Sequence, residues 1–268
     1  MRKIFLLFVG VFFLCTGMGQ ASNINITIPD GISGGGFGNN SQKESGQGQE
    51  DNEVEPGCVA NQSWDLEGLF LNGNMLSLVG GYNFRDGEIG GSNLVFSSGD
   101  IFISTGKPKY GITDGTSGNG YHSVSNTYGY NYVLDLDIAG GKYDVYEITQ
   151  SSKVTTSWYK QNQGSNPWRY DKDGKPVDKY MGKSLIYNKD NTETTTNYNN
   201  IFYGGFHREL IVDLGFLESE TEFYVHYTMG CGNDNIMGQY IPNPEPATML
   251  LLGFGLIGAA GLGRRKIS

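Results

Sequence analysis

Residues 134–148 read LDLDIAGGKYDVYEI, and the start of this stretch carries the pattern that decides the fold. Apolar and acidic residues alternate there in the order Leu134, Asp135, Leu136, Asp137 and Ile138. A period of two is typical of a β-strand with one buried and one solvated face. A weaker alternation follows at Tyr143, Val145 and Ile148. This stretch therefore predicts strands and no helix.

Two further segments repeat the pattern. Apolar residues occupy every second position in residues 210–216 and again in residues 223–229. No long stretch has the helical period of 3.6 residues. Gly accounts for 41 of the 268 residues, Tyr for 17 and Phe for 14, and such a composition favours strands joined by tight turns.

Two short segments resemble hairpins. Residues 70–76 place Asn72-Gly73 between apolar runs, and residues 96–102 repeat the arrangement around Ser98-Gly99. We therefore expect an all-β fold of about ten to twelve strands, arranged as a two-layer β-sandwich or jelly roll.

The composition divides the chain into regions. Residues 31–56 hold almost no apolar side chains, so we assign residues 22–56 to a flexible linker rich in Gly, Ser and Gln. The folded ectodomain is expected over residues 57–240. Within it, the polar stretch 160–200 is expected to be a long surface excursion with room for one hairpin.

The charge distribution excludes one class of partner. The net charge is −9, and five of the 19 basic residues stand at the two ends of the chain. The remaining 14 basic residues face 28 acidic ones, so the central region would repel nucleic acid. We expect no nucleic-acid partner.

The first 21 residues have the three parts of a secretory signal peptide. Arg2 and Lys3 precede an apolar run, Ile4–Leu14, and small residues follow. We expect signal peptidase to cut between Ala21 and Ser22. Two alternatives are a lipoprotein modified at Cys15, which lacks the small preceding residue of a lipobox, and an N-terminal anchor that stays in place.

Three elements follow one another near the end of the sequence. They are Pro244-Glu245-Pro246, then a run without charge from Ala247 to Gly263, then the basic cluster Arg264-Arg265-Lys266. The uncharged run has 17 residues, which rise about 25 Å as a helix and just cross the hydrocarbon core of a membrane. The basic cluster is expected to stay cytoplasmic, so the preceding domain faces outward. The prolines keep the segment around Glu245 extended.

This tail closely resembles the PEP-CTERM sorting signal of Gram-negative bacteria. The resemblance rests on the Pro-Glu-Pro motif, the Ala-Thr after it, the Gly-rich span and the Arg-rich end. It implies an inner-membrane intermediate facing the periplasm, an exosortase that cuts near the motif, and release to the cell surface or the extracellular space. It also implies a host that makes exopolysaccharide. A simple C-terminal anchor is the alternative.

Two cysteines remain after removal of the signal peptide, Cys58 and Cys231. They stand near opposite ends of the expected ectodomain, and the compartment is oxidising. We therefore expect a disulfide between them.

Metal binding has only weak signals in the sequence. The three histidines lack the spacing of zinc ligands. Calcium needs several hard oxygen ligands from loops, and no EF-hand motif is present. The weak calcium candidates are Asp65, Asp100, Asp135, Asp137 and Asp234. No other cofactor is expected.

The candidate glycan-binding residues are aromatic. Trp158 and Trp168 lie in or beside the polar stretch, where exposed rings could stack on sugars. No H-E-x-x-H motif or P-loop is present, and no catalytic residue is assigned. We expect a non-enzymatic surface or matrix protein, active in adhesion or associated with exopolysaccharide. The alternative is a secreted jelly-roll lectin or glycan-active hydrolase, which could depend on calcium.

Overall fold

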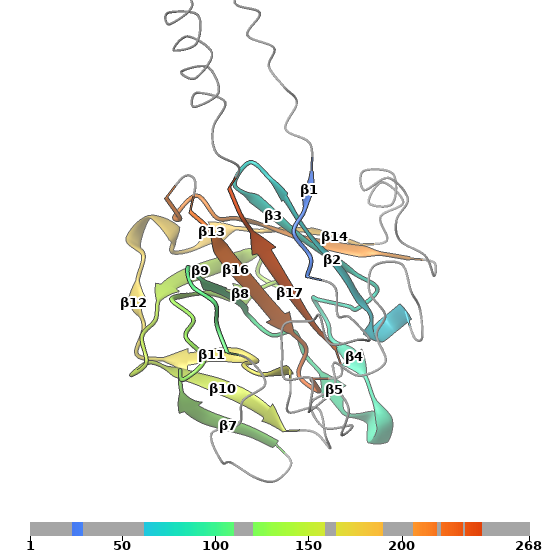
Figure 1. Ribbon diagram of the computed structural model, residues 1–268. Helices are drawn as coiled ribbons and strands as arrows, with labels where there is room; N and C mark the ends of the chain where they lie inside the picture. Colours follow the sequence, from blue (N-terminus) through green and yellow to red (C-terminus); the bar gives the residue numbers. More distant parts are fainter. Residues whose placement is uncertain are drawn as a thin grey trace, which may run out of the picture.

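Antiparallel strands make up almost all the regular structure of the described residues, as the alternating sequence predicts (Figure 1). The computed structural model describes residues 23–28, 62–109, 120–158, 165–189, 206–218, 221–232 and 234–242. The expected signal peptide, residues 1–21, and residues 243–268 of the expected sorting tail lie outside these ranges. The all-β prediction is confirmed.

A five-stranded sheet has the order β1-β2-β3-β15-β14. Its strands are β1 (Ile24–Asn25), β2 (Leu66–Asn72), β3 (Met75–Gly80), β14 (Ile186–Asn188) and β15 (Arg208–Asp213). The hairpin expected at Asn72-Gly73 forms, because Asn72 pairs with Met75 across the turn. Gly73 has a φ of 59°, a backbone conformation that glycine adopts without strain.

A seven-stranded sheet has the order β12-β9-β8-β6-β16-β17, with β13 also paired to β9. Its strands are β6 (Ile101–Ser104), β8 (Tyr132–Asp137), β9 (Lys142–Glu147), β12 (Lys175–Pro176), β13 (Lys183–Ser184), β16 (Phe223–Thr228) and β17 (Asn235–Tyr240). The alternating stretch 134–148 forms the β8–β9 pair, with Leu134 opposite Val145.

Two smaller sheets complete the described strands. The three-stranded sheet holds β7 (Gly120–Ser125), β10 (Lys153–Trp158) and β11 (Arg169–Lys172), and β4 (Glu88–Ile89) pairs with β5 (Val95–Phe96). Short 3-10 helices are η1 (Gln62–Trp64), η2 (Gly91–Asn93) and η4 (Asp178–Tyr180).

The five- and seven-stranded sheets share one hydrophobic core. Leu69, Leu78 and Leu210 come from the first sheet, and Ile103 and Val225 from the second; all are fully buried. This burial is the main stabilising term of the fold, at about 25 cal/mol per Å² of apolar surface removed from water.

The three-stranded sheet covers part of the opposite face of the seven-stranded sheet. A second cluster joins Phe102 and Val133 of the large sheet to Val124 and Val154 of the small one. β16 is buried along its whole length, although its alternating sequence predicts a strand with only one buried face. On its second face, Tyr224 packs with Met237 and Ile28, and His226 Nε2 lies 2.9 Å from the carbonyl oxygen of Pro167.

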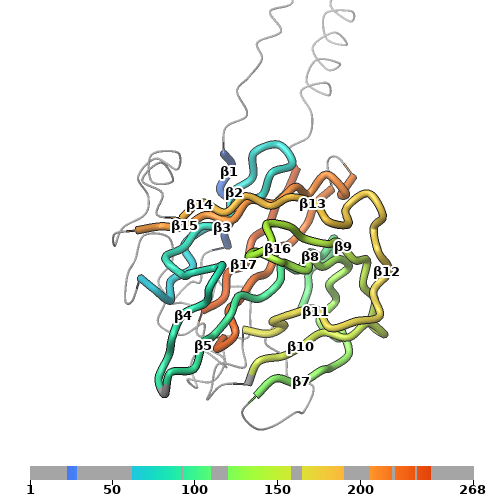
Figure 2. Tube along the Cα trace, turned by 180° about the vertical axis from the view of Figure 1, so that it is seen from behind, coloured from blue at the N-terminus to red at the C-terminus, as the bar shows by residue number. Residues whose placement is uncertain are grey.

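Two segments pass from one large sheet to the other. Residues 183–188 pair first with β9 through β13 and then with β15 through β14 (Figure 2). Residues 23–28 pair with β2 and bridge to β17 through Thr27 and Gly238. The two sheets are thus joined by backbone hydrogen bonds on both sides of the core.

Three sequence predictions need correction. Residues 23–28 were assigned to the linker, yet they pair with β2, because Ile26 is apolar and packs in the core. Residues 165–189, expected as a surface excursion with room for one hairpin, contain four strands that pair with three different sheets. Residues 96–102 form no hairpin: β5 pairs with β4, while β6 pairs with β8 and β16.

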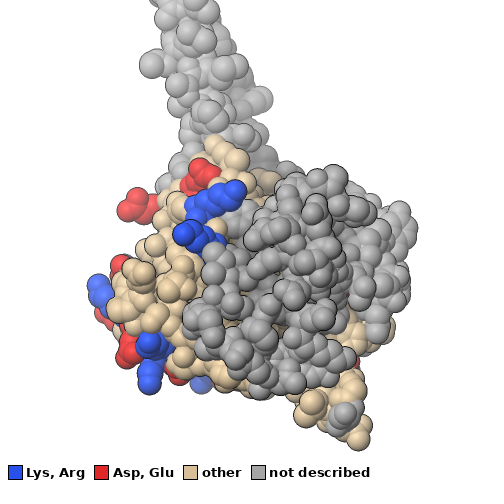
Figure 3. All heavy atoms as spheres, turned by 60° about the horizontal axis from the view of Figure 1, so that its bottom comes forward, with Lys and Arg blue, Asp and Glu red and all other residues tan. Residues whose placement is uncertain are grey.

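The described surface carries charges of both signs. On the face shown in Figure 3, Lys and Arg side chains lie among Asp and Glu side chains, with uncharged surface between them.

Candidate functional site

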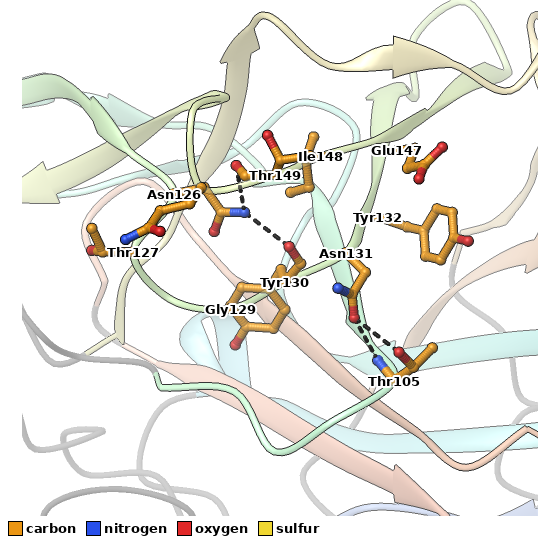
Figure 4. Close-up of a pocket in the computed structure, with 11 residues that line it drawn as sticks. Thr105, Asn126, Thr127, Gly129, Tyr130, Asn131, Tyr132, Glu147, Ile148 and Thr149 are labelled. Carbon is orange, nitrogen blue, oxygen red and sulfur yellow. Dashed lines mark hydrogen bonds between the residues drawn. The ribbon is translucent and has the colours of Figure 1, made fainter.

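A polar surface pocket lies where the three-stranded sheet meets one end of β8 and β9. Its volume is about 460 Å³, within the range of about 300–1,000 Å³ that is typical of small-molecule sites. Three segments that are separate in the sequence form it (Figure 4). The lining residues are Thr105, Asn126, Thr127, Gly129, Tyr130, Asn131, Tyr132, Glu147, Ile148, Thr149 and Gln150.

Two asparagine side chains hold the walls of the pocket in place. Asn126 donates through Nδ2 to the carbonyl oxygens of Tyr130 (2.8 Å) and Thr149 (3.3 Å). Asn131 accepts through Oδ1 from the backbone nitrogen of Thr105 (2.9 Å) and from its hydroxyl (3.1 Å). These bonds, visible in Figure 4, tie the loop before β8 to the ends of β6 and β9.

The lining is rich in hydroxyl and amide groups and poor in charge. Among the described lining residues, Glu147 is the one charged side chain, and it lies 3.9 Å from the exposed ammonium of Lys175. Tyr132 adds a half-buried aromatic ring, which packs against Phe216 with ring centroids 5.2 Å apart. Such a surface suits an uncharged ligand with many hydroxyl groups.

Two buried polar atoms lie in the pocket wall. Asn126 Oδ1 and the hydroxyl of Tyr130 have no hydrogen-bond partner among the described protein groups. Burial raises the pKa of the Tyr130 hydroxyl well above its usual value, so this group stays protonated and can donate. Both atoms are shielded from solvent, and the Tyr130 ring packs against Phe102 with ring centroids 5.4 Å apart.

The calcium candidates are spread over several places. Asp137 accepts from the backbone nitrogen of Gly140 and pairs with Lys142, as in an ordinary turn. Buried Asp234 accepts from the backbone nitrogen of Leu66, next to buried Asp65. In the part of the chain that the structure describes, no three His, Cys, Asp or Glu side chains form a group able to hold a metal ion.

Asp100 and Asp135 lie close enough to influence each other. Asp100 is buried, and its two oxygens accept from the backbone nitrogens of Leu136 (3.0 Å) and Tyr170 (2.7 Å). Burial raises the pKa of both carboxyl groups, and the charge of Asp135 raises that of Asp100 further. Asp100 therefore acts in the described structure as a link between strands.

Trp168 does not offer the exposed ring that its polar neighbourhood predicts. It is 7% exposed, and Tyr121 stacks on it with ring centroids 4.2 Å apart. The Arg169 guanidinium lies 4.9 Å from its ring centroid. The polar sequence around Trp168 gives no sign of this burial, because the ring that covers it, Tyr121, comes from another part of the chain. The side chain of Trp158 lies outside the described residues.

Cys231 is buried in the main core, at 3% exposure. Its expected partner Cys58 lies outside the described residues, and those residues contain no disulfide. The bond stays a prediction, which a thiol count on the denatured protein would test.

The expected processing and anchoring sites also lie outside the described residues. They are the predicted cleavage site Ala21-Ser22, the Pro244–Pro246 motif and the basic cluster 264–266. Among the residues that the structure describes, no helix is long and apolar enough to cross a membrane.

The pocket residues were not singled out from the sequence. Asn126, Asn131 and Tyr132 are common residue types in a common setting, and only the pairing of β8 with β6 and β9 brings them to Thr105 and Glu147. No local motif signals such a site.

The comparisons with known proteins bear on the end of the chain. Residues 244–266 match the family model described as the PEP-CTERM protein-sorting motif. No curated protein and no solved structure matches the chain. The motif indicates an exported protein that an exosortase sorts to the cell surface through a membrane-anchored intermediate. Residues 244–266 of this chain are a PEP-CTERM protein-sorting motif.

Proposed function

We propose that the protein is a non-enzymatic component of the cell surface or extracellular matrix whose β domain associates with exopolysaccharide. In this proposal the domain is a two-layer β-sandwich, and signal peptidase and an exosortase process its two ends. The observation that carries the proposal is the match of residues 244–266 to the sorting motif.

The arrangement of the described ends supports this route. Ile26 and Gln239 are hydrogen-bonded neighbours, so the segment after the signal peptide and the strand before the sorting tail lie at the same end of the molecule (Figure 1). A domain with this geometry can fold while both ends are still held at one membrane. Its other surfaces then remain free for contacts.

The pocket supports the association with exopolysaccharide. Its hydroxyl and amide groups match the hydrogen-bonding groups of a sugar, and the half-buried ring of Tyr132 provides apolar surface beside them. No Lys or Arg stands among its described lining residues, which disfavours phosphorylated or strongly acidic ligands.

The same lining favours binding over hydrolysis. Most glycosidases use two carboxyl groups that face each other across the scissile bond. Glu147 is the one carboxylate among the described lining residues. We therefore expect the protein to retain a polysaccharide without releasing products.

Mass spectrometry of the mature protein from its native host tests the sorting step. We expect a new C-terminus within or just after Pro244–Pro246. A Glu245→Ala variant should keep the tail and stay in the membrane fraction, whereas Glu218→Ala, at an exposed position of the β domain, should be processed normally. A wild-type protein that ends at Ser268 would contradict the proposal.

A pull-down with the host's exopolysaccharide, paired with a hydrolysis assay, tests the role of the domain. Thr127→Trp places a large side chain in the pocket and should reduce retention. The control Ala139→Trp adds the same side chain at an exposed turn at the far end of the β8–β9 pair. If both variants are retained equally by the exopolysaccharide, the pocket is not the binding site. Release of sugar products would favour a hydrolase.

A further inference from the structure

Residues 23–28 fill a gap between the edges of two strands. On one side, the backbone nitrogen of Ile26 donates to the carbonyl oxygen of Leu69 at 2.9 Å. On the other side, the nitrogen of Ile28 donates to Met237 at 2.8 Å, and that of Gln239 donates to Ile26 at 2.7 Å. These six residues therefore complete the edge of β2 and the edge of β17 together.

The gap is shaped to receive this segment. Ile26 is 4% exposed and belongs to the main core. Opposite it, Gly238 has no side chain, and a Cβ there would lie 2.9 Å from Cδ1 of Leu69 and 3.2 Å from the carbonyl oxygen of Ile26. Removal of the segment would leave two strand edges and an apolar slot open, and open edges readily pair with another strand.

The covalent connection does not force the segment to fill its own domain. The chain has 33 residues between Ile28 and Gln62, which can span up to about 110 Å when extended. The segment thus lies at the end of a long connection, and cleavage after Ala21 would leave Ser22 as the N-terminus beside Asn23.

We propose that residues 23–28 are exchanged between copies, so that the segment of one molecule fills the gap between β2 and β17 of a second copy. An exchanged segment makes the same contacts as the original one, so the exchange adds no strain to the domain. The effective concentration of a tethered segment falls as its connection lengthens, so the 33-residue connection weakens the preference of the segment for its own domain, and exchange is favoured where copies are crowded, as on a cell surface. The exchange would link sorted copies to one another without a further partner.

Asn23 and Asn72 provide the test. Both are exposed, and Nδ2 of Asn72 donates to Oδ1 of Asn23 at 3.1 Å, so cysteines at these positions would face each other. Concentrated, processed Asn23→Cys protein is mixed with processed Asn72→Cys protein and oxidised. Peptide mass spectrometry then measures the disulfide between positions 23 and 72. A linkage in this mixture can form only between two molecules.

The control mixture pairs Asn23→Cys with Gln150→Cys, which is also exposed but lies in the pocket, away from β2 and β17. We expect about tenfold or more linked dimer in the first mixture, because docking raises the local concentration of the two thiols above that of random collision. An excess of a free peptide of residues 22–30 should lower the yield by competing for the gap.

Equal dimer yields in the two mixtures would overturn the proposal. In that case the Asn23→Cys/Asn72→Cys double variant should form its disulfide entirely within one chain. This outcome would leave the sorting and glycan proposals untouched, because neither depends on which copy supplies the segment.

Discussion

At the scale of single residues, Asp100 shows how position changes the chemistry of a side chain. In the sequence it is one acid among 28, and the structure buries it at 2% exposure. Its hydrogen bonds to Leu136 and Tyr170 join the start of β6 to β8 and β11. Burial and the nearby charge of Asp135 raise its pKa to about 7. In the unfolded chain an Asp titrates near pH 4.

This shift predicts a pH dependence of stability. Between about pH 4 and pH 7 the folded protein holds a proton on Asp100 that the unfolded chain has released, so this contribution to stability is lost as the pH rises through that range. Asp100→Asn removes the titrating group. We expect the unfolding free energy of the wild type, measured by chemical denaturation, to fall relative to that of Asp100→Asn between about pH 4 and pH 7. If the difference in unfolding free energy between the wild type and Asp100→Asn stays constant across this pH range, the raised pKa of Asp100 is refuted.

At the scale of elements, the segment around Gly99 shows where local patterns mislead. Ser98-Gly99 resembles a hairpin turn, yet the chain continues into β6 and packs closely against two other segments. The nitrogen of Gly99 donates to Thr228 at 3.0 Å, and that of Asp100 donates to Trp168 at 2.9 Å. Glycine is needed there for close backbone approach and not for a turn.

We therefore predict a sharp difference between two glycines. A Cβ on Gly99 would lie 2.5 Å from the carbonyl oxygen of Trp168 and would also clash with that of Thr228, while a Cβ on Gly91 has no neighbour within 4 Å. Gly99→Ala should lower the unfolding free energy by about 1–3 kcal/mol or more. Gly91→Ala should change it by about 0.5 kcal/mol at most. Equal melting temperatures of the two variants would show that the backbone around Gly99 moves enough to accommodate a Cβ at little cost.

The N-terminal segment allows a second test at this scale. Ile26 is buried in the core, whereas Ile24 is 47% exposed on the same short segment. Ile26→Ala should cost about 2–5 kcal/mol of stability, because it leaves a cavity between the sheets. Ile24→Ala should cost much less. Urea unfolding measures the free energy of unfolding of both variants. If Ile26→Ala leaves this free energy unchanged, the segment does not unfold together with the core.

At the scale of the whole molecule, we expect the sorting tail and the β domain to act as separate units. The described core is closed by β17 and by residues 23–28, upstream of the sorting motif. We expect the protein ending at Pro242 to melt at the same temperature as the processed native form and to stay soluble after export. A large drop in melting temperature would mean that the tail contributes to the packed core.

The sequence by itself determined the sorting motif and the all-β class. A sorting signal is read as a linear pattern of an extended motif, an apolar run and basic residues, so it needs no fold to be recognised. Alternation along a single strand is likewise a local signal, and it correctly located β8, β9, β15 and β16.

The tertiary structure decided which strands pair, where Trp168 and Asp100 lie, and which residues line the pocket. It also placed residues 23–28 between β2 and β17, although their neighbours in sequence are polar. The physical reason is that antiparallel pairing and close packing join segments far apart in the chain. Whether an edge, a slot or a pocket exists depends on all of those segments at once, and no single stretch of sequence carries that information.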